Sequence, residues 1–156
     1  MAIEWRKYKP WLKYHRIAAL CVVFTYITIK YINRQDSDSY ENGQIKHEGR
    51  RENGFNEGRW IWYYPNGRRQ MEGYFKHGKR NGKWIMYNKN ENIINERNYE
   101  NDKLNGTFVD YYFNGNKKTE GSFLNDKLTG TIIEYNEEGT IIKKELFENG
   151  LKKEIK

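Results

Sequence analysis

The amino-acid sequence predicts an all-β fold, a single-layer antiparallel β-meander of repeated hairpins that follows one amino-terminal transmembrane helix. Three observations lead to this prediction. Segments of similar sequence recur every 24 residues and begin at Gly58, Gly82, Gly106 and Gly130. Turn-forming residues fall twice within each period. A charge-free run of thirteen residues precedes the repeats. A fixed period of this length is the signature of a repeat array.

The charge-free run extends from Ile17 to Ile29 and is short for a membrane span. Thirteen helical residues cover about 20 Å, whereas the hydrocarbon core of a bilayer is about 30 Å thick. Apolar and aromatic flanks lengthen the run to Trp11–Ile32, about 33 Å, if Lys30 snorkels to the interface. We therefore predict an uncleaved signal anchor that contacts the membrane from Ile17 to Ile32. A cleaved signal peptide and a soluble docking helix are the alternatives.

The positive charge of the chain is concentrated at its amino-terminal end. Residues 1–33 hold six Lys and Arg residues and one acid, Glu4, whereas residues 34–156 hold 22 basic and 20 acidic residues. This bias predicts a single-pass membrane protein with a cytoplasmic N-terminus and repeats outside the cytoplasm. The repeats carry mixed charge rather than a basic patch, so we expect no nucleic-acid partner.

The period divides the chain into three parts. Residues 1–33 are the cytoplasmic basic segment and the transmembrane signal anchor. Residues 34–57 are a polar linker and a degenerate first repeat, in which Tyr40 and Gly49 match Tyr64 and Gly73. Residues 58–156 are four full repeats with a C-terminal tail. Atypical end units are expected in an array because a terminal repeat has one neighbour fewer.

Each repeat is predicted to be a hairpin with a turn at both ends. Asn66-Gly67 and Asn114-Gly115 are signals for a two-residue type I′ turn, which needs positive φ at both residues. Asn90-Glu91 lacks the glycine, so its turn is expected to be longer or strained. The second turn of each unit, such as Asn101-Asp102, also uses residues that tolerate the left-handed conformation.

The Asn-Gly turns predict the cross-strand register. Trp60 faces Gly73 and Phe75 faces Gly58 in this register. We expect a large ring to lie over each facing glycine, where it restores packing that a bare strand lacks. Arg97 replaces the glycine opposite Trp84, so a cation–π contact between these two is the expected substitute.

These spaced residues also resemble a known repeat. The pattern Gly-x-Trp-x-x-Tyr-Tyr-x-Asn-Gly, then Glu-Gly-x-Phe-x-x-Gly-Lys-x-x-Gly-x-Trp, is best matched from Gly58 to Trp84. It is similar to the MORN-repeat variant found in bacterial proteins of the YwqK antitoxin type, over about residues 40–153. The resemblance implies a β-hairpin array and a protein-binding antitoxin or immunity role. It brings no catalytic residue with it.

The sequence offers no catalytic constellation. His15, His47 and His77 do not stand at metal-ligand spacing, and Cys21 is the only cysteine. We expect Cys21 to be a small buried hydrophobe, with lipoprotein acylation as the alternative. Accordingly we expect no enzymatic activity, no metal and no cofactor.

Recurring side chains are the candidate contacts with a partner. The row of Tyr63, Tyr87, Tyr111 and Tyr135 fits either structural packing or a stacking platform. The recurring Glu48, Glu72, Glu96 and Glu120 are expected to be a solvated row beside Lys and Arg, with a carboxylate ladder that binds cations as the alternative. The candidate partner-binding residues are Trp60, Trp62, Tyr63, Tyr64, Trp84, Tyr87, Tyr111, Tyr112 and Tyr135.

The function predicted from these features is that of a membrane-anchored, protein-binding repeat protein. A toxin or an envelope protein is the expected partner, and the role is antitoxin-like or immunity-like. The alternative is a structural envelope module that binds peptidoglycan, polysaccharide or lipid headgroups.

Overall fold

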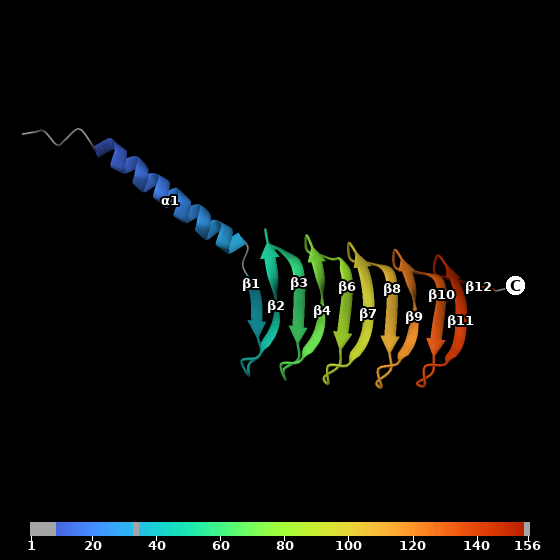
Figure 1. Cartoon of the computed structure of the whole chain (residues 1–156). Coiled ribbons are helices and arrows are strands. Elements are labelled where there is room, and N and C mark those ends of the chain that lie inside the picture. Colours follow the sequence, from blue (N-terminus) through green and yellow to red (C-terminus); the bar gives the residue numbers. More distant parts are fainter. Residues whose placement is uncertain (1–8, 33–34, 155–156) are drawn as a thin grey trace, which may run out of the picture.

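A computed structural model of the chain describes residues 9–32 and 35–154, which form one helix and a twelve-stranded sheet. Helix α1 spans Lys9–Ile32 and projects beyond the first strand, away from the sheet (Figure 1). The predicted basic segment before Lys9 lies outside the described residues. The strands are β1 (Gln35–Ser39), β2 (Ile45–Glu52), β3 (Phe55–Tyr63), β4 (Arg69–Lys76), β5 (Lys79–Arg80), β6 (Gly82–Tyr87), β7 (Ile93–Glu100), β8 (Lys103–Tyr111), β9 (Lys117–Leu124), β10 (Lys127–Tyr135), β11 (Ile141–Glu148) and β12 (Leu151–Lys153).

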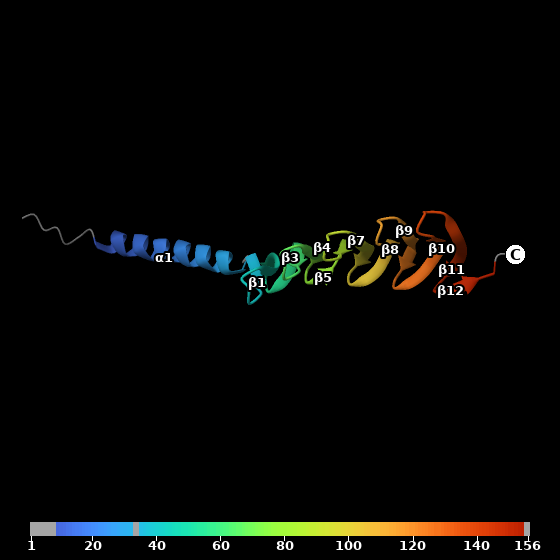
Figure 2. The ribbon, with the colours of Figure 1, turned by 90° about the horizontal axis from the view of Figure 1, so that it is seen from below.

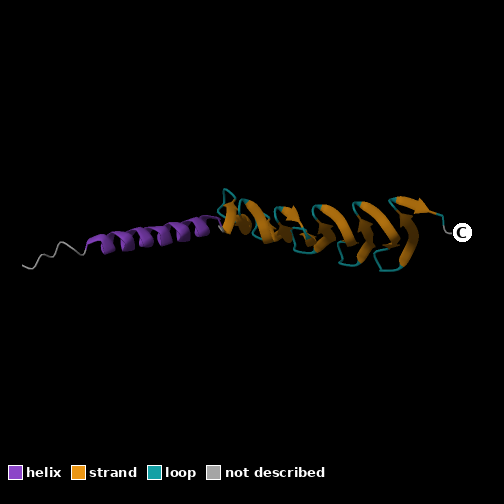
Figure 3. Cartoon of the chain, turned by 90° about the horizontal axis from the view of Figure 1, so that it is seen from above, coloured by secondary structure: helices purple, strands orange, loops and turns teal. Residues whose placement is uncertain are grey.

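The strands follow one another through the sheet in the order of the sequence, and every pair is antiparallel. β5 pairs with β4 and is separated from β6 by Asn81 alone. Seen along two further directions, the hairpins form one curved ribbon (Figures 2 and 3). The predicted meander of repeated hairpins is therefore confirmed. Part of the expected linker is also strand, because Gln35 of β1 pairs with Arg50 of β2.

Helix α1 does not support the predicted membrane anchor. Within the described residues, no helix combines the length and the apolar character that crossing a lipid bilayer requires. The charge-free stretch Ile17–Ile29 is only about two thirds as long as the hydrocarbon core is thick. The prediction of a single-pass membrane protein with a cytoplasmic N-terminus and external repeats is thus contradicted. Cys21 is exposed on this helix, so its predicted burial is also wrong.

The two turns of each repeat differ in type, and the sequence assigned the types incorrectly. The turn after β3 is a three-residue loop: Gly67 donates its N–H to the Tyr64 carbonyl at 2.9 Å, and only Gly67 of the Asn66-Gly67 pair has positive φ. This is a type I turn with a glycine bulge, which suits Pro65 at its second position. The type I′ turns lie at the opposite ends of the strands, where both central residues of the turn, such as Asn101 and Asp102, have positive φ.

Glu91 occupies the glycine position of the loop after β6. Its φ is +65°, and its N–H bonds to the Asn88 carbonyl at 2.9 Å, so this loop has the same length as the others and is strained, not longer.

Replacing Glu91 with glycine is expected to stabilise the protein by up to about 1 kcal/mol, because glycine adopts the left-handed conformation without steric cost. The exposed pair between Glu91 and Arg69, 3.6 Å apart, is worth little by comparison. Urea denaturation measures the change. The matched control Asn90→Gly, at a residue without positive φ, should destabilise the protein instead; stabilisation by both variants would contradict the strain.

The predicted register is correct, but the rings over Gly49 and Gly73 come from the other neighbouring strand; at Gly121 an added Cβ would lie 2.9 Å from the predicted ring of Phe108 and 2.2 Å from Ile132. Trp60 pairs with Gly73, as expected. A Cβ added to Gly73 would nevertheless lie 2.2 Å from the ring of Trp84, and one on Gly49 would lie 2.1 Å from Trp60. Trp60 and Trp84 therefore each cover the glycine of the preceding repeat, and this contact joins one repeat to the next.

The glycines that open the repeats are not covered by rings. Gly58 has φ +70°, and a Cβ placed on it would meet nothing within 4 Å. The β2–β3 register shifts beside it, so Gly58 is a bulge that brings Trp60 over the preceding repeat. Arg97, which replaces a covered glycine, lies over the ring of Phe108 at 5.1 Å rather than contacting Trp84 as predicted.

The carboxyl-terminal end of the array replaces this packing with an ion-pair cluster. Glu145 stands 24 residues after Gly121, in the series of covered glycines. Its carboxylate lies 3.1 Å from the Lys143 ammonium and 2.6 Å from that of Lys152, and its side chain is 14% exposed. Paired charges at this point suit a terminal unit, whose outer side must be polar.

Candidate functional site

The sheet has two chemically different faces, because successive strand residues point to opposite sides. We call one the tryptophan face; it carries the buried residues Trp60, Trp84, Phe108 and Ile132, each 24 residues from the next. We call the other the tyrosine face; it carries the row of Tyr63, Tyr87, Tyr111 and Tyr135.

Tyrosines on the tyrosine face hydrogen-bond to glutamates of the preceding repeat. Tyr87 donates its hydroxyl proton to Glu72 at 2.6 Å, and Tyr63 donates to Glu48 at 2.6 Å. Tyr135 makes the equivalent bond to Glu120. Glu72, Glu96 and Glu120 pair with Arg59, Lys83 and Lys117, as expected of glutamates beside Lys and Arg, but their side chains are only 14%, 18% and 28% exposed, so these three are less solvated than predicted. These contacts favour the packing interpretation of the tyrosine row.

These hydrogen bonds between tyrosines and glutamates, which we call the tyrosine–glutamate ladder, shift the pKa values of the residues that form them. Burial and the hydrogen bond to Glu72 raise the pKa of Tyr87 to about 12, and burial and Glu48 do the same for Tyr63. Burial alone would raise the pKa of Glu72, but hydrogen bonds from Tyr87 and Arg59 hold it below its usual value.

Stability is expected to fall as the pH rises from about 10 to about 12. In this window the unfolded tyrosines lose their protons near pH 10, while Tyr63 and Tyr87 in the folded chain keep theirs until about pH 12. The folded state thus binds more protons, so the free energy of unfolding decreases with pH. Urea midpoints between pH 8 and 11.5 measure the slope. The slope should be shallower in a Tyr63→Phe/Tyr87→Phe variant, and an unchanged slope would contradict the assignment.

A second set of tyrosines connects adjacent loops. The hydroxyl of Tyr64 donates to the Tyr87 carbonyl at 2.8 Å, and that of Tyr112 donates to the Tyr135 carbonyl at 2.8 Å. The hydroxyl groups of two predicted contact residues, Tyr64 and Tyr112, are therefore used within the array.

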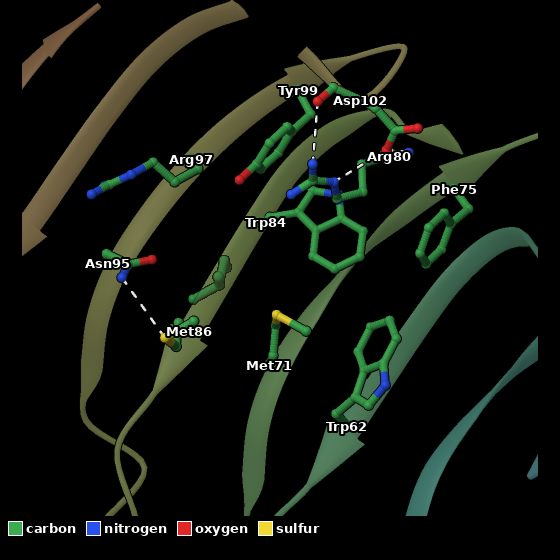
Figure 4. A pocket seen from close by; sticks show the side chains of 11 residues that line it. Trp62, Met71, Phe75, Arg80, Trp84, Met86, Asn95, Arg97, Tyr99 and Asp102 are labelled. Carbon is green, nitrogen blue, oxygen red and sulfur yellow. Dashed lines mark hydrogen bonds and ion pairs between the residues drawn. The ribbon is translucent and has the colours of Figure 1, made fainter. Parts of the chain in front are cut away.

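The tryptophan face holds a groove between the second and third hairpins, which we call the aromatic groove. Its volume is about 440 Å³. Trp62, Met71 and Phe75 come from β3 and β4, and Trp84 and Met86 come from β6 (Figure 4). The remaining lining residues are Arg80, Ile85, Asn95, Arg97, Tyr99 and Asp102.

Ring contacts join the aromatic residues of this groove into a continuous series. Trp84 lies with its ring centroid 5.5 Å from Trp62, and Phe75 meets Trp84 edge-on at 5.0 Å. Tyr99 follows at 6.1 Å from Trp84. The guanidinium of Arg80 lies over the ring of Tyr99 at 4.0 Å and pairs with Asp102 at 3.1 Å. The positive charge at this end of the groove is therefore neutralised by the Asp102 carboxylate.

The predicted contact residues divide by exposure. Trp60, Trp84 and Tyr87 are buried, with 2%, 6% and 5% of their surface exposed, so they offer a partner little area. Trp62 is half-buried and lies at the groove. The other candidates, Tyr63, Tyr64, Tyr111, Tyr112 and Tyr135, are half-buried outside the groove. The structure therefore brings Trp62 and Trp84 together and leaves the tyrosines apart from them.

Sequence reasoning missed several residues of the groove. Met71, Phe75, Met86 and Tyr99 line it but were not among the predicted contacts. The 24-residue period could have identified two of them, because Phe75 and Tyr99 are aromatic residues at equivalent positions of successive repeats. Among the described residues, no group of three or more His, Cys, Asp and Glu side chains could hold a metal ion.

Comparison with known protein families agrees with this geometry. Residues 56–77, 80–101 and 104–125 match the family model described as the MORN repeat variant. Each matched segment covers one hairpin with its three-residue loop and ends at the first residue of the next type I′ turn. No curated protein matches the chain. These three segments of the chain are therefore similar to the MORN repeat variant, and repeats of this kind suggest a repeat-based binding module.

Proposed function

We propose that the array binds a partner protein through the aromatic groove. The observation that supports this most directly is the series of aromatic rings along one face, of which Trp62, Phe75 and Tyr99 stay partly exposed beside Met71 and Met86. Large rings give contact area at low entropic cost, and methionine adapts to the shape of a partner.

A toxin is the class of partner that we propose. The basis is the resemblance of the repeat pattern to YwqK-type antitoxins. A neutralising protein needs an extended surface that blocks its target rather than an active site, and a single-layer array presents such a surface. The paired guanidinium of Arg80 at the end of the groove adds a polar rim, as is usual around the apolar core of a protein interface.

The test is affinity capture with the intact chain and two variants. Trp62→Ala removes a ring of the groove, and Tyr74→Ala removes an aromatic side chain, 51% exposed, from the tyrosine face. We expect the Trp62 variant to lose binding by about thirtyfold, as for a central contact residue, and the Tyr74 variant to bind normally. Equal binding by both variants would contradict the groove.

Coexpression then tests the class of partner. A captured toxin arrests growth when it is expressed alone, and the intact chain relieves the arrest whereas Trp62→Ala does not. Saturable co-sedimentation with peptidoglycan, polysaccharide or anionic vesicles, without a protein partner, would instead favour the envelope alternative and reject a protein-binding role.

A further inference from the structure

A second hollow lies beside Tyr111 on the tyrosine face, between the loops that follow β6 and β8. Its volume is about 370 Å³. We call it the Tyr111 hollow. Its lining residues are Glu91, Asn92, Ile93, Tyr111, Phe113, Asn114 and Gly115.

An arginine side chain fills the equivalent place one repeat earlier. The guanidinium of Arg69 lies 4.5 Å from the ring centroid of Tyr87, and its Nη1 is 3.3 Å from the Tyr87 hydroxyl. The same side chain pairs with Glu72 at 3.5 Å and with Glu91 at 3.6 Å. Stacking on a ring beside carboxylates is the arrangement that a planar guanidinium favours.

The 24-residue period maps this cradle onto the hollow. The residues that follow Arg69, Tyr87 and Glu91 by one period are Ile93, Tyr111 and Gly115, and all three line the hollow. The tyrosine ring is thus retained, while the arginine that would cover it is replaced by a shorter apolar side chain.

The neighbouring repeats show why a hollow forms here. Lys117 takes the position of the arginine one repeat later and pairs with Glu120 at 2.7 Å. Ile45 takes it one repeat before Arg69, but there the Gln44 side chain lies against Gly67, with its Oε1 2.8 Å from where a Cβ would be. The residue that corresponds to Gln44 beside the hollow is the shorter Asn92.

The charges around the hollow favour a cation. Glu91 supplies a carboxylate from the lining, 45% exposed, and its contact with Arg69 is long at 3.6 Å. The nearby cations Lys83 and Lys117 are each bound to a glutamate, at 2.8 Å and 2.7 Å. Burial and the charge of Glu96 raise the pKa of Tyr111 even though Lys83 and Lys117 act in the opposite direction.

We propose that the Tyr111 hollow binds an arginine side chain of a partner protein, with the guanidinium stacked on Tyr111 beside the Glu91 carboxylate. The contact reproduces between two molecules the one that Arg69 and Tyr87 make within the chain. The site is separate from the aromatic groove and does not depend on the function proposed for it.

Titration with a small probe tests the site in the full chain. N-acetyl-L-arginine N-methylamide is added to isotope-labelled protein, and the citrulline analogue, which has the same shape without the charge, is the control. We expect NMR shifts centred on Ile93, Tyr111 and Phe113, with binding about tenfold tighter for the arginine probe. Equal binding of both probes, or shifts spread over the whole array, would overturn the proposal.

Two exchanges within the array make the test specific. Ile93→Arg supplies the side chain internally, as Arg69 does, and should abolish probe binding without loss of fold. Arg69→Ile should open a second hollow beside Tyr87 and add shifts there. Probe binding that persists in Ile93→Arg, or an Arg69→Ile variant that folds and shows no new shifts, would contradict the assignment.

Discussion

Replacing Gly73 with alanine is expected to destabilise the array by about 3 kcal/mol. The added Cβ would lie 2.2 Å from the ring of Trp84, which is 6% exposed and packs edge-on against Phe75, so the ring must leave its packed position to admit the methyl group. Urea denaturation followed by circular dichroism measures the loss. Gly58→Ala is the control, because that Cβ meets nothing and the cost, about 1 kcal/mol, comes from positive φ alone. Equal losses at both glycines would contradict the ring-over-glycine contact.

The array itself suggests a compensating change. One repeat later the same two positions hold Arg97 and Phe108, with the guanidinium over the smaller ring. Gly73→Arg combined with Trp84→Phe transfers this pair. We expect the double variant to be about 2 kcal/mol more stable than the sum of its single variants predicts, because the two residues share one contact. Additive losses would show that the pair is not transferable.

Replacing Trp84 with alanine is expected to cost about 4 kcal/mol and to weaken the cooperativity of unfolding. Trp84 contacts Trp62 of the preceding repeat, covers Gly73 and donates its indole N–H to the Tyr74 carbonyl at 3.2 Å. An array depends on such contacts between neighbouring units, so their loss should separate the first two hairpins from the rest.

Denaturation curves with two transitions, or with a reduced slope, are the expected readout. Phe113→Ala is the matched control: its ring is 74% exposed, and its loss should change the free energy of unfolding by no more than about 0.5 kcal/mol. A single transition of unchanged slope in the Trp84 variant would show that the repeats are coupled by other contacts.

The sequence predicted the register well because register follows from spacing. Gly58 pairs with Phe75 and Gly106 with Phe123, as the hairpin pattern requires. The turn types were misassigned because Asn-Gly suits both a type I′ turn and the last two positions of a type I loop with a bulge. The three-residue loop and its bulge leave the pairing beyond them unchanged, so the register was correct although the turn was not.

The candidate site was harder to predict. The period identifies equivalent residues, but it does not show which of the two neighbouring strands supplies the ring that packs against a given position. Trp60 and Trp62 look alike in the sequence, yet Trp60 is buried over Gly49 and Trp62 is half-buried at the groove. The predicted membrane anchor is wrong for a different reason. That prediction adds the flanking aromatic residues to the length of the helix, whereas the charge-free stretch itself is too short to cross a bilayer.

The sequence by itself therefore determined the repeat, its period, the meander and the strand register, since these depend on residue spacing along one chain. The tertiary structure alone decided which repeat each ring covers, which tyrosines are used within the ladder and where hollows remain. The physical reason is the bulge at each opening glycine. The bulge turns the strand, so the ring that follows the opening glycine packs against the preceding repeat rather than against its partner strand in the same hairpin.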